Sequence, residues 1–440
     1  MTSKNTLETQ LHDMAASHFK PNEPGASIIV MRDGEPLLRA GFGLANIELG
    51  VSIQPDMVFR LGSITKQFTA VAILMLEERG QLSLQDPIER FISDYPTHGH
   101  KITVEHLLTH TSGIKSYTSM PEFWADQKED KAVLDHINIF RDQPMAFAPG
   151  ERWDYNNSGY FLLGAIIENV SGRSYEDFLK QNIFDQLGMT HTYFDLPTKI
   201  IPGRVAGYGK GVNGLENAAY ISMTRPYAAG SLASTVDDLA KWDAALYTNE
   251  LVDQTTLKRA WTPFILNSGA NNQYGYGWSI CAYQGHTCIE HGGGIHGFNT
   301  FAIRIPERRV YVAALMNAMP PPVSPMLLGF KLAALAIDKP YSEPIAITLK
   351  DDALKQFVGC YEVNHATIFP IIVTLQSGQL FVQFSEGEPT QEVFALSPTA
   401  FFLKESLWQI RFVVDTTRQV QAAQIWDRDL LAAEGIRVKP

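Results

Sequence analysis

Two residues at the start of a long apolar segment could perform nucleophilic chemistry. Ser63 and Lys66 stand three positions apart, and the residues that follow, 68–76, are nearly all apolar. This pattern predicts a helix that begins near Ser63, ends near Gly80 and is buried on most sides. Residues three apart share one helix face, so we expect the Lys66 ammonium to lie near the Ser63 hydroxyl.

Such a pair is the minimum for an activated serine. A hydroxyl is a poor nucleophile until a base takes its proton, and a lysine serves when burial lowers its pKa towards neutrality. The helix N-terminus adds free N–H groups and a positive dipole end, which stabilise developing negative charge. Because Ser-x-x-Lys arises often by chance, an ordinary helix start with a solvated lysine is the alternative for this motif alone.

Two further stretches could complete a site. Tyr155 and Asn157 precede another apolar helical run; a tyrosine beside an ammonium can transfer a proton, and a carboxamide can hold a substrate amide. Three glycines, 292–294, follow His291 at the end of a strand-like run and leave one short surface without side chains, where a substrate backbone can approach. Helix capping and a flexible hairpin connection are the structural alternatives.

Both strands and helices are expected to position these motifs. Asp33-Gly34 between two apolar runs predicts a hairpin. Region 81–189 is mostly helical in pattern, and strand patterns return further along the chain, at 276–281, 287–290, 298–305 and 310–316, before a helix at 325–337. The pattern therefore predicts a helical insertion between sheet segments.

The C-terminal part changes character after a proline-containing linker. Short strand-like runs separated by turn residues predict a small antiparallel β-barrel or sandwich. We expect a domain at 1–338, a linker at 339–349 and a barrel domain at 350–440.

Composition excludes several classes of partner. The 440 residues are 45% hydrophobic and 19% charged, as in globular proteins, and the net charge of −11 argues against nucleic acid or an anionic membrane. No apolar run reaches the ~20 residues of a membrane span, and the polar start lacks a signal-peptide pattern. A cytoplasmic protein is expected, or a periplasmic or secreted one if a leader was removed. Cys281 and Cys288 flank a predicted turn, which permits a disulfide without requiring one.

Taken together, the three motifs resemble those of the penicillin-recognising serine hydrolases, close to class C β-lactamases and their esterase and D-aminopeptidase relatives. Ser63-Ile64-Thr65-Lys66 resembles the Ser-x-x-Lys motif, Tyr155-Asn156-Asn157 the Tyr-x-Asn motif, and His291-Gly292-Gly293 the third, strand-borne motif. The stretches 107–113 and 229–232 are also similar to the family. The resemblance implies an α+β fold. Its first domain would be β-lactamase/transpeptidase-like, with an antiparallel sheet flanked by helices and a helical subdomain, and its C-terminal domain a small lipocalin-like antiparallel β-barrel.

The resemblance also implies roles. Ser63 would be the nucleophile, Lys66 and Tyr155 the proton-transfer pair, Asn157, His291 and Gly293 the substrate-binding residues, and the N–H groups of Ser63 and Gly294 the oxyanion hole. Which of Lys66 and Tyr155 is the resting base stays open.

One departure from the family concerns substrate choice. His291 stands where typical members carry a lysine, and a mostly neutral imidazole supplies less fixed charge. The family implication is a D-amino-acid-specific peptidase or an esterase with weak or no β-lactamase activity. It would act on small molecules or short peptides without a cofactor or metal, and a homo-oligomer is compatible with it.

Two other readings are weighed against this one. A non-enzymatic binding or self-assembling relative would keep the fold. A metallohydrolase would use a histidine-rich region that holds Asp94, His98, His100, His106 and His110, although the spacing matches no specific zinc motif.

Overall fold

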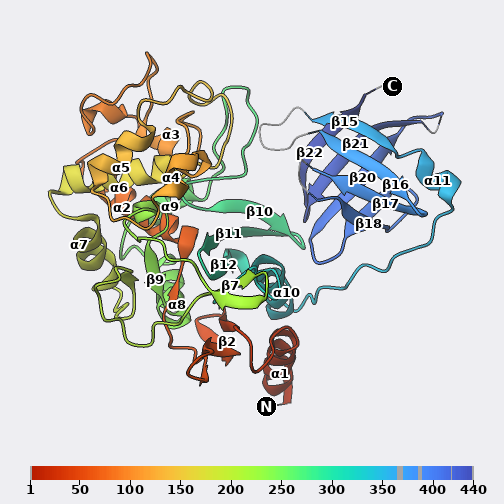
Figure 1. Cartoon of the computed structure of the whole chain (residues 1–440), viewed down its shortest axis with the longest axis horizontal. Helices are drawn as coiled ribbons and strands as arrows, with labels where there is room; N and C mark the ends of the chain where they lie inside the picture. The colour runs from red at the N-terminus through yellow and green to blue at the C-terminus, as the bar shows by residue number, and fades with distance from the viewer. Residues whose placement is uncertain (1, 364–369, 385–388, 418, 439–440) are drawn as a thin grey trace. The chain divides into compact units, whose positions relative to one another are not determined.

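The computed structural model describes residues 2–363, 370–384, 389–417 and 419–438. The chain divides into two compact units (Figure 1). The first comprises Met1–Ile280 and Cys288–Lys339, and the second Cys281–Thr287 and Pro340–Pro440. The division at Lys339 falls at the beginning of the linker expected from the sequence.

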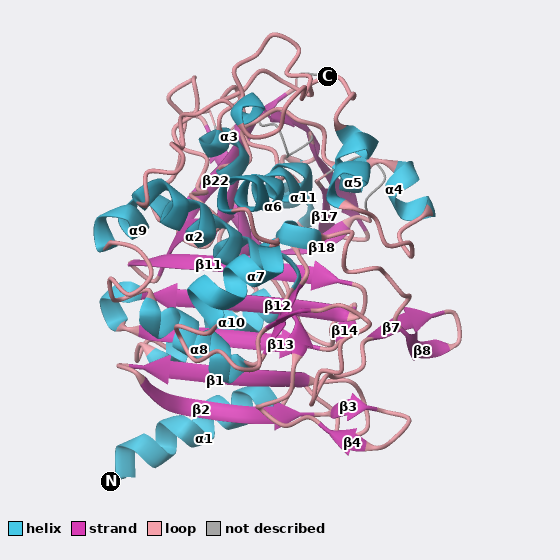
Figure 2. Cartoon of the chain, turned by 90° about the vertical axis from the view of Figure 1, so that its left-hand side faces the viewer, coloured by secondary structure: helices cyan, strands magenta, loops and turns pink. Residues whose placement is uncertain are grey.

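A six-stranded sheet in the order β10-β11-β12-β13-β1-β2 forms the centre of the first unit (Figure 2). Its strands are β1 (Ala26–Arg32), β2 (Glu35–Phe42), β10 (Ser279–Tyr283), β11 (His286–Ile295), β12 (Phe298–Ile305) and β13 (Val310–Met316). The pairs β11–β12, β12–β13, β13–β1 and β1–β2 are antiparallel. Asp33 and Gly34 join β1 to β2 with φ of 55° and 82°, as a type I′ turn requires, so the predicted hairpin is confirmed.

Helices cover both faces of this sheet. Helix α10 (Pro325–Ala336) packs on β12 and β13, and α1 (Thr2–Ala16) packs on β2 and α10. Helix α8 (Val236–Ala245) contacts β13 and β1 from the other side (Figure 1). Every residue of β13 is consequently buried, which explains its continuous apolar run.

The remaining helices form the predicted helical subdomain around α2 and α6. Helix α2 (Thr65–Glu78) is buried from Thr65 to Leu76, as its all-round apolar pattern predicted, and α6 (Asn157–Ser171) packs against it. The others are α3 (Val104–Leu108), α4 (Pro121–Ala125), α5 (Val133–Phe140), α7 (Tyr175–Leu179) and α9 (Gln254–Ala260).

Three sets of short strands complete the first unit. The sets are β5-β9-β6, β14-β7-β8 and β3-β4. Their bounds are β3 (Leu44–Asn46), β4 (Val51–Ser52), β5 (Phe59–Arg60), β6 (Tyr193–Phe194), β7 (Tyr208–Gly211), β8 (Gly214–Asn217), β9 (Leu232–Ser234) and β14 (Ala318–Met319).

The second unit contains a closed barrel of eight antiparallel strands, β15 to β22, and this confirms the predicted C-terminal barrel. The strands are β15 (Gly359–Val363), β16 (Ile371–Gln376), β17 (Gln379–Gln383), β18 (Gln391–Ala395), β19 (Ala400–Leu403), β20 (Trp408–Val414), β21 (Val420–Asp427) and β22 (Leu430–Arg437), preceded by α11 (Asp351–Lys355). Phe357 stacks on Phe412 inside, with ring centroids 4.4 Å apart.

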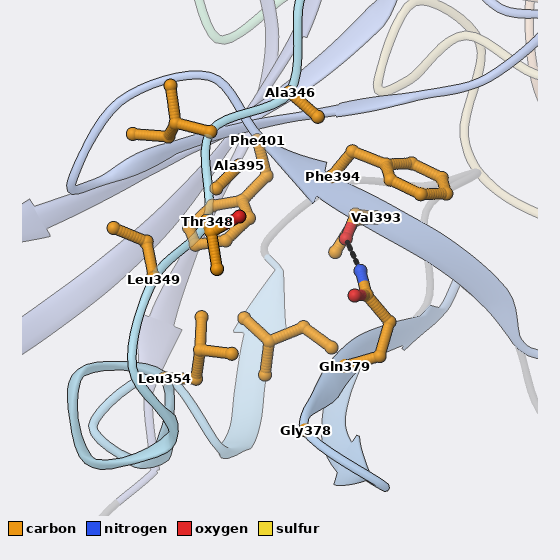
Figure 3. A pocket seen from close by; sticks show the side chains of 12 residues that line it. Ala346, Thr348, Leu349, Leu354, Gly378, Gln379, Val393, Phe394, Ala395 and Phe401 are labelled. Atoms are coloured by element: carbon orange, nitrogen blue, oxygen red, sulfur yellow. Dashed lines mark hydrogen bonds between the residues drawn. The ribbon is translucent and has the colours of Figure 1, made fainter.

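Part of the expected linker belongs to the barrel's packing. Residues 346–349 run across β17 and β18, and Ile347 N donates to Ala395 O over 2.8 Å. A cavity of about 240 Å³, lined mainly by residues of apolar type, lies beneath this segment, where Gln379 Nε2 donates to Val393 O over 2.6 Å (Figure 3). The barrel therefore uses linker residues to cover its side.

Candidate active site

A tight turn between β5 and α2 carries Ser63. The turn Gly62–Ile64 is a 3-10 helix that runs directly into α2, and Leu61 N donates to Leu232 O of β9 over 2.8 Å. Gly62 has a φ of +55°, and a Cβ atom there would lie 2.8 Å from Gly294 N. Glycine is required for both reasons, and it lets the backbone of β11 approach the turn directly.

The glycine run of β11, residues 292–294, packs against the turn that carries Ser63. A Cβ on Gly293 would lie 2.0 Å from Leu61 O, whereas one on Gly292 would have its nearest neighbour at 3.6 Å. Thr300 Oγ1 donates to Leu61 O over 2.7 Å and links the turn to β12. Of these two glycines, Gly293 is therefore the one that close packing demands, and the backbone of Gly294, the next residue, lies against Gly62 in the turn that carries Ser63.

Lys66 lies fully buried behind Ser63 with three oxygen atoms around its amine. Nζ is 3.0 Å from Ser63 Oγ, 2.8 Å from Asn157 Oδ1 and 2.9 Å from Ala229 O. No Asp or Glu among the described residues forms an ion pair with it. Burial without a compensating carboxylate lowers the pKa of Lys66 well below 10.5.

The three neighbours fit a neutral amine. Asn157 Oδ1 and Ala229 O only accept hydrogen bonds, so they take the two N–H groups of an amine, whereas the Ser63 hydroxyl can donate its proton to the remaining lone pair. The faces of Tyr155 and Tyr160, at 4.8 and 5.4 Å from Nζ, favour the charged form. Such contacts are worth about 1–2 kcal/mol, less than the cost of a fully buried charge.

Asn157 is held in one orientation. It begins α6, its Nδ2 donates to Thr118 Oγ1 over 3.2 Å, and its backbone N donates to Ser116 Oγ over 3.2 Å. The first of these bonds fixes which amide atom faces Lys66. The preceding residue, Asn156, caps the helix by accepting from Gly159 N.

Tyr155 lies against the same amine with a buried phenol. Burial raises its pKa, and an interaction with Ser63 opposes part of the rise. Within the described part of the chain, Tyr155 Oη has no hydrogen bond of ordinary geometry. The phenol is therefore protonated near neutral pH and has a hydrogen-bonding site open to a bound molecule.

His291 is buried next to Tyr155, and both its ring nitrogens are engaged. Nδ1 lies 2.6 Å from Gly292 O and Nε2 2.9 Å from Tyr274 Oη, so Nδ1–H donates to the carbonyl and Nε2 accepts from the phenol. Burial is the main cause that lowers the pKa of His291 to about 3, and a protonated Lys66 would act in the same direction. The imidazole is neutral, and its fixed partners leave it no N–H to offer a substrate.

A second histidine enters the site that sequence reasoning did not assign to it. The ring of His110 lies 4.4 Å from that of Tyr155 and 4.7 Å from that of Tyr274. His110 Nδ1 accepts from Asn156 N over 3.0 Å, and Nε2 is buried without a partner among the described residues. The family-like stretch 107–113 is the signal in the sequence that could have found it, whereas the spacing of the histidines alone offers His110 only as a candidate metal ligand.

The histidines of that stretch serve separate purposes. His106 Nδ1 accepts from Thr103 N in a capping box at the start of α3, while His110 faces the tyrosines. Across the described ranges, no group of three or more His, Cys, Asp or Glu side chains is placed to hold a metal ion. No helix in the same ranges is long and apolar enough to cross a membrane.

Comparisons with known proteins identify the relatives of this chain. The Beta-lactamase family model matches residues 7–336, and a domain of unknown function, DUF3471, matches residues 343–435. Penicillin-binding protein 4* of Bacillus subtilis (strain 168) is 28% identical over 432 residues, 93% of each chain. A D-aminopeptidase of Gluconobacter oxydans (strain 621H) is 26% identical over 75% of this chain and 62% of its own length.

Among solved structures, the octameric penicillin-binding protein homologue from Pyrococcus abyssi superimposes with a TM-score of 0.69 and 27% identity over 99% of this chain and 100% of its own. The family model spans more than half of the chain, and the three motifs lie within its range in the expected order. The chain therefore belongs to the Beta-lactamase family, within the penicillin-recognising serine hydrolases.

Proposed function

We propose that this protein is a serine hydrolase that cleaves amide or ester bonds through an acyl-Ser63 intermediate. The observation that carries the proposal is the 3.0 Å separation of Lys66 Nζ from Ser63 Oγ, with a buried amine that has no carboxylate partner among the described residues. This supports Lys66 as the resting base, because burial that lowers the pKa of an amine raises that of the Tyr155 phenol.

Acylation follows from these protonation states. Lys66 takes the proton of Ser63, and Oγ attacks the carbonyl carbon of the substrate. The N–H groups of Ser63 and Gly294 hold the oxyanion, beside the close approach of Gly62 to β11. Tyr155 gives its proton to the leaving nitrogen or oxygen as the bond breaks, and recovers one from the Lys66 ammonium.

Deacylation repeats the transfers with water. Water loses a proton to Lys66 by way of Tyr155, its oxygen attacks the acyl carbon, and Ser63 Oγ recovers the proton on leaving. The resting enzyme is restored with both groups neutral, and the net reaction consumes one water. Asn157 keeps the amine aimed at Ser63 through its bond of 2.8 Å.

The substrates we propose are D-amino-acid peptides or amides, or simple esters, with weak or no β-lactam hydrolysis. The D-aminopeptidase relative supports the first class. A neutral His291 with both nitrogens engaged supports the last point, because the strand supplies no cation for a β-lactam carboxylate.

The test is labelling of Ser63 by a fluorophosphonate probe, followed by a panel of p-nitrophenyl esters, D- and L-aminoacyl amides and nitrocefin. Ser63→Ala should lose both labelling and turnover. A folded protein in which Ser63 stays inert would favour the alternative, a binding relative that kept the fold.

We also propose that the chain forms a homo-oligomer, since the similar Pyrococcus abyssi protein is described as octameric. Light scattering across a range of concentrations tests this, and a monomer mass throughout would contradict it.

A further inference from the structure

A second cavity lies next to the turn that carries Ser63. Its volume is about 240 Å³, and four segments of the first unit line it: β5, the residues before β7, the residues after β8, and the turn from β11 to β12. Arg60, Arg204 and His296 contribute basic side chains to the lining, and no Asp or Glu belongs to it.

The charge of this cavity is positive. Arg60 Nε lies 2.7 Å from Asp195 Oδ2 and Arg204 Nε 3.3 Å from Asp195 Oδ1, so two guanidinium groups share one fully buried carboxylate. Arg204 Nη2 is also occupied, because it donates to Leu196 O and Lys199 O. In the described part of the chain, the two Nη atoms of Arg60 have no hydrogen-bond partner, and one positive charge is left over.

The cavity is within reach of an acyl group on Ser63. Arg60 precedes Ser63 by three residues, at most roughly 11 Å of chain. On the other strand, His296 follows Gly294 by two residues. Trp124 connects the cavity to the proposed catalytic residues. Its ring lies 6.2 Å from that of His296, and its Nε1 donates to the carbonyl oxygen of Thr118. Thr118 Oγ1 in turn accepts from Asn157 Nδ2 and orients that side chain.

The direction of β11 assigns this cavity to the acyl part of the substrate. The strand passes Ser63 from His291, beside Tyr155, to the turn at His296. A leaving group must meet the Tyr155 phenol that protonates it. The part of the substrate that stays on Ser63 therefore points towards the other end of the strand, where the cavity lies.

We propose that this cavity is an acyl-side subsite for a carboxylate, with Arg60 as the residue that determines specificity and His296 as a second donor. The inference rests on the proposed function and deepens it by naming the substrate class: amides or esters whose acyl group ends in a carboxylate. The guanidinium offers two N–H groups in the fork that a carboxylate matches.

The experiment compares succinyl, glutaryl and adipoyl 4-nitroanilides with counterparts in which a carboxamide replaces the carboxylate. At least one carboxylate member should exceed its neutral counterpart in kcat/KM by about tenfold, the usual effect of a charge-assisted hydrogen bond. A substrate with its carboxylate on the leaving group should gain nothing.

Two substitutions locate the effect. Arg60→Gln should abolish the preference and Arg60→Lys should keep part of it, but Arg60 also neutralises buried Asp195, so these variants can lose stability. Ala219→Glu places a negative charge in the lining without touching that pair and should lower the preference several-fold. Val212→Glu is the matched control, because Val212 is fully exposed on the β7–β8 hairpin outside the lining.

The outcomes separate this inference from the proposed function. Turnover of neutral and charged anilides at equal rates would overturn the subsite and leave the hydrolase intact, as would a preference that Ala219→Glu leaves unchanged. If neither anilide is cleaved and Ser63 is not labelled, titration calorimetry compares the binding affinities of the carboxylate and carboxamide compounds. Tighter binding of the carboxylate, weakened in Ala219→Glu, supports the subsite, and equal or absent binding overturns it.

Discussion

Replacing Gly293 by alanine tests the close approach on which the proposed oxyanion hole depends. The added Cβ would lie 2.0 Å from Leu61 O, where ordinary contact begins at 3.4 Å, so β11 or the turn must move by about 1.4 Å. Leu61 O cannot yield easily, because it accepts from Thr300 Oγ1. The displacement therefore falls on the backbone next to Ser63 and Gly294.

The expected cost follows from that distance. A misplacement of about 1 Å can lower a rate ~10²-fold, and loss of one oxyanion donor costs a similar or larger factor. We expect kcat for an amide or ester to fall by about 10²-fold or more in Gly293→Ala. Overpacking should lower the free energy of unfolding by about 1–3 kcal/mol.

The assay pairs this variant with Gly292→Ala, whose Cβ has its nearest neighbour at 3.6 Å. Turnover, the rate of fluorophosphonate labelling and urea denaturation are measured for both. The control should stay within a few-fold of the parent in all three. A Gly293→Ala protein that keeps both its fold and its rate, or a Gly292→Ala control that loses as much, would contradict the role proposed for this close approach.

Three further results are expected. The acid limb of the pH profile of kcat/KM should report the lowered pKa of Lys66, so activity should rise with pH well below 10.5. The free energy of unfolding, measured by urea denaturation, should also rise with pH in that range, because the unfolded chain binds a proton that native Lys66 has released. Lys66→Met should remove both the activity and this rise in the free energy of unfolding. His291→Lys should improve the ratio of kcat/KM for carboxylate-bearing over neutral substrates, at a cost in stability of about 1–2 kcal/mol from the lost bond to Tyr274; an unchanged ratio would contradict a role of position 291 in sensing the carboxylate. Arg304→Met should lower the free energy of unfolding by about 3–5 kcal/mol, because it removes the guanidinium whose Nε lies 2.9 Å from Oδ1 of buried Asp243. A loss below about 1 kcal/mol would contradict a stabilising role of this buried pair.

Sequence patterns predicted those elements of the fold that depend on interactions between residues close together in the chain. The Asp33-Gly34 hairpin and the buried helix after Ser63 depend on turn chemistry and apolar spacing within a few residues. The pairing of β13 with β1 could not be predicted in the same way, because it joins residues nearly 300 positions apart, such as Ala26 and Met316. Nothing in either strand alone specifies that neighbour.

The site shows the same limit. Spacing indicated that Ser63 and Lys66 meet, but the proposal of Lys66 as the resting base depends on its burial, which arises only in the folded chain. His110 lies in a family-like stretch and Arg60 stands three residues before Ser63, but what their side chains face is decided by contacts with distant segments, such as Tyr155 for His110 and Asp195 for Arg60. Likewise, three equivalent glycines in the sequence differ sharply once Leu61 lies beside Gly293.

The surroundings of Lys66 have a consequence for how the proposed hydrolase would respond to ionic strength. In the proposed resting state the amine, the Tyr155 phenol and the imidazoles of His110 and His291 are all uncharged. Dissolved ions screen interactions between charges, so they have little to screen at a centre built from dipoles and shielded from solvent. The chemical step should therefore proceed at nearly the same rate in dilute and concentrated salt. Recognition through the half-buried Arg60 should weaken as salt is added, and a salt titration would separate the two contributions without any substitution.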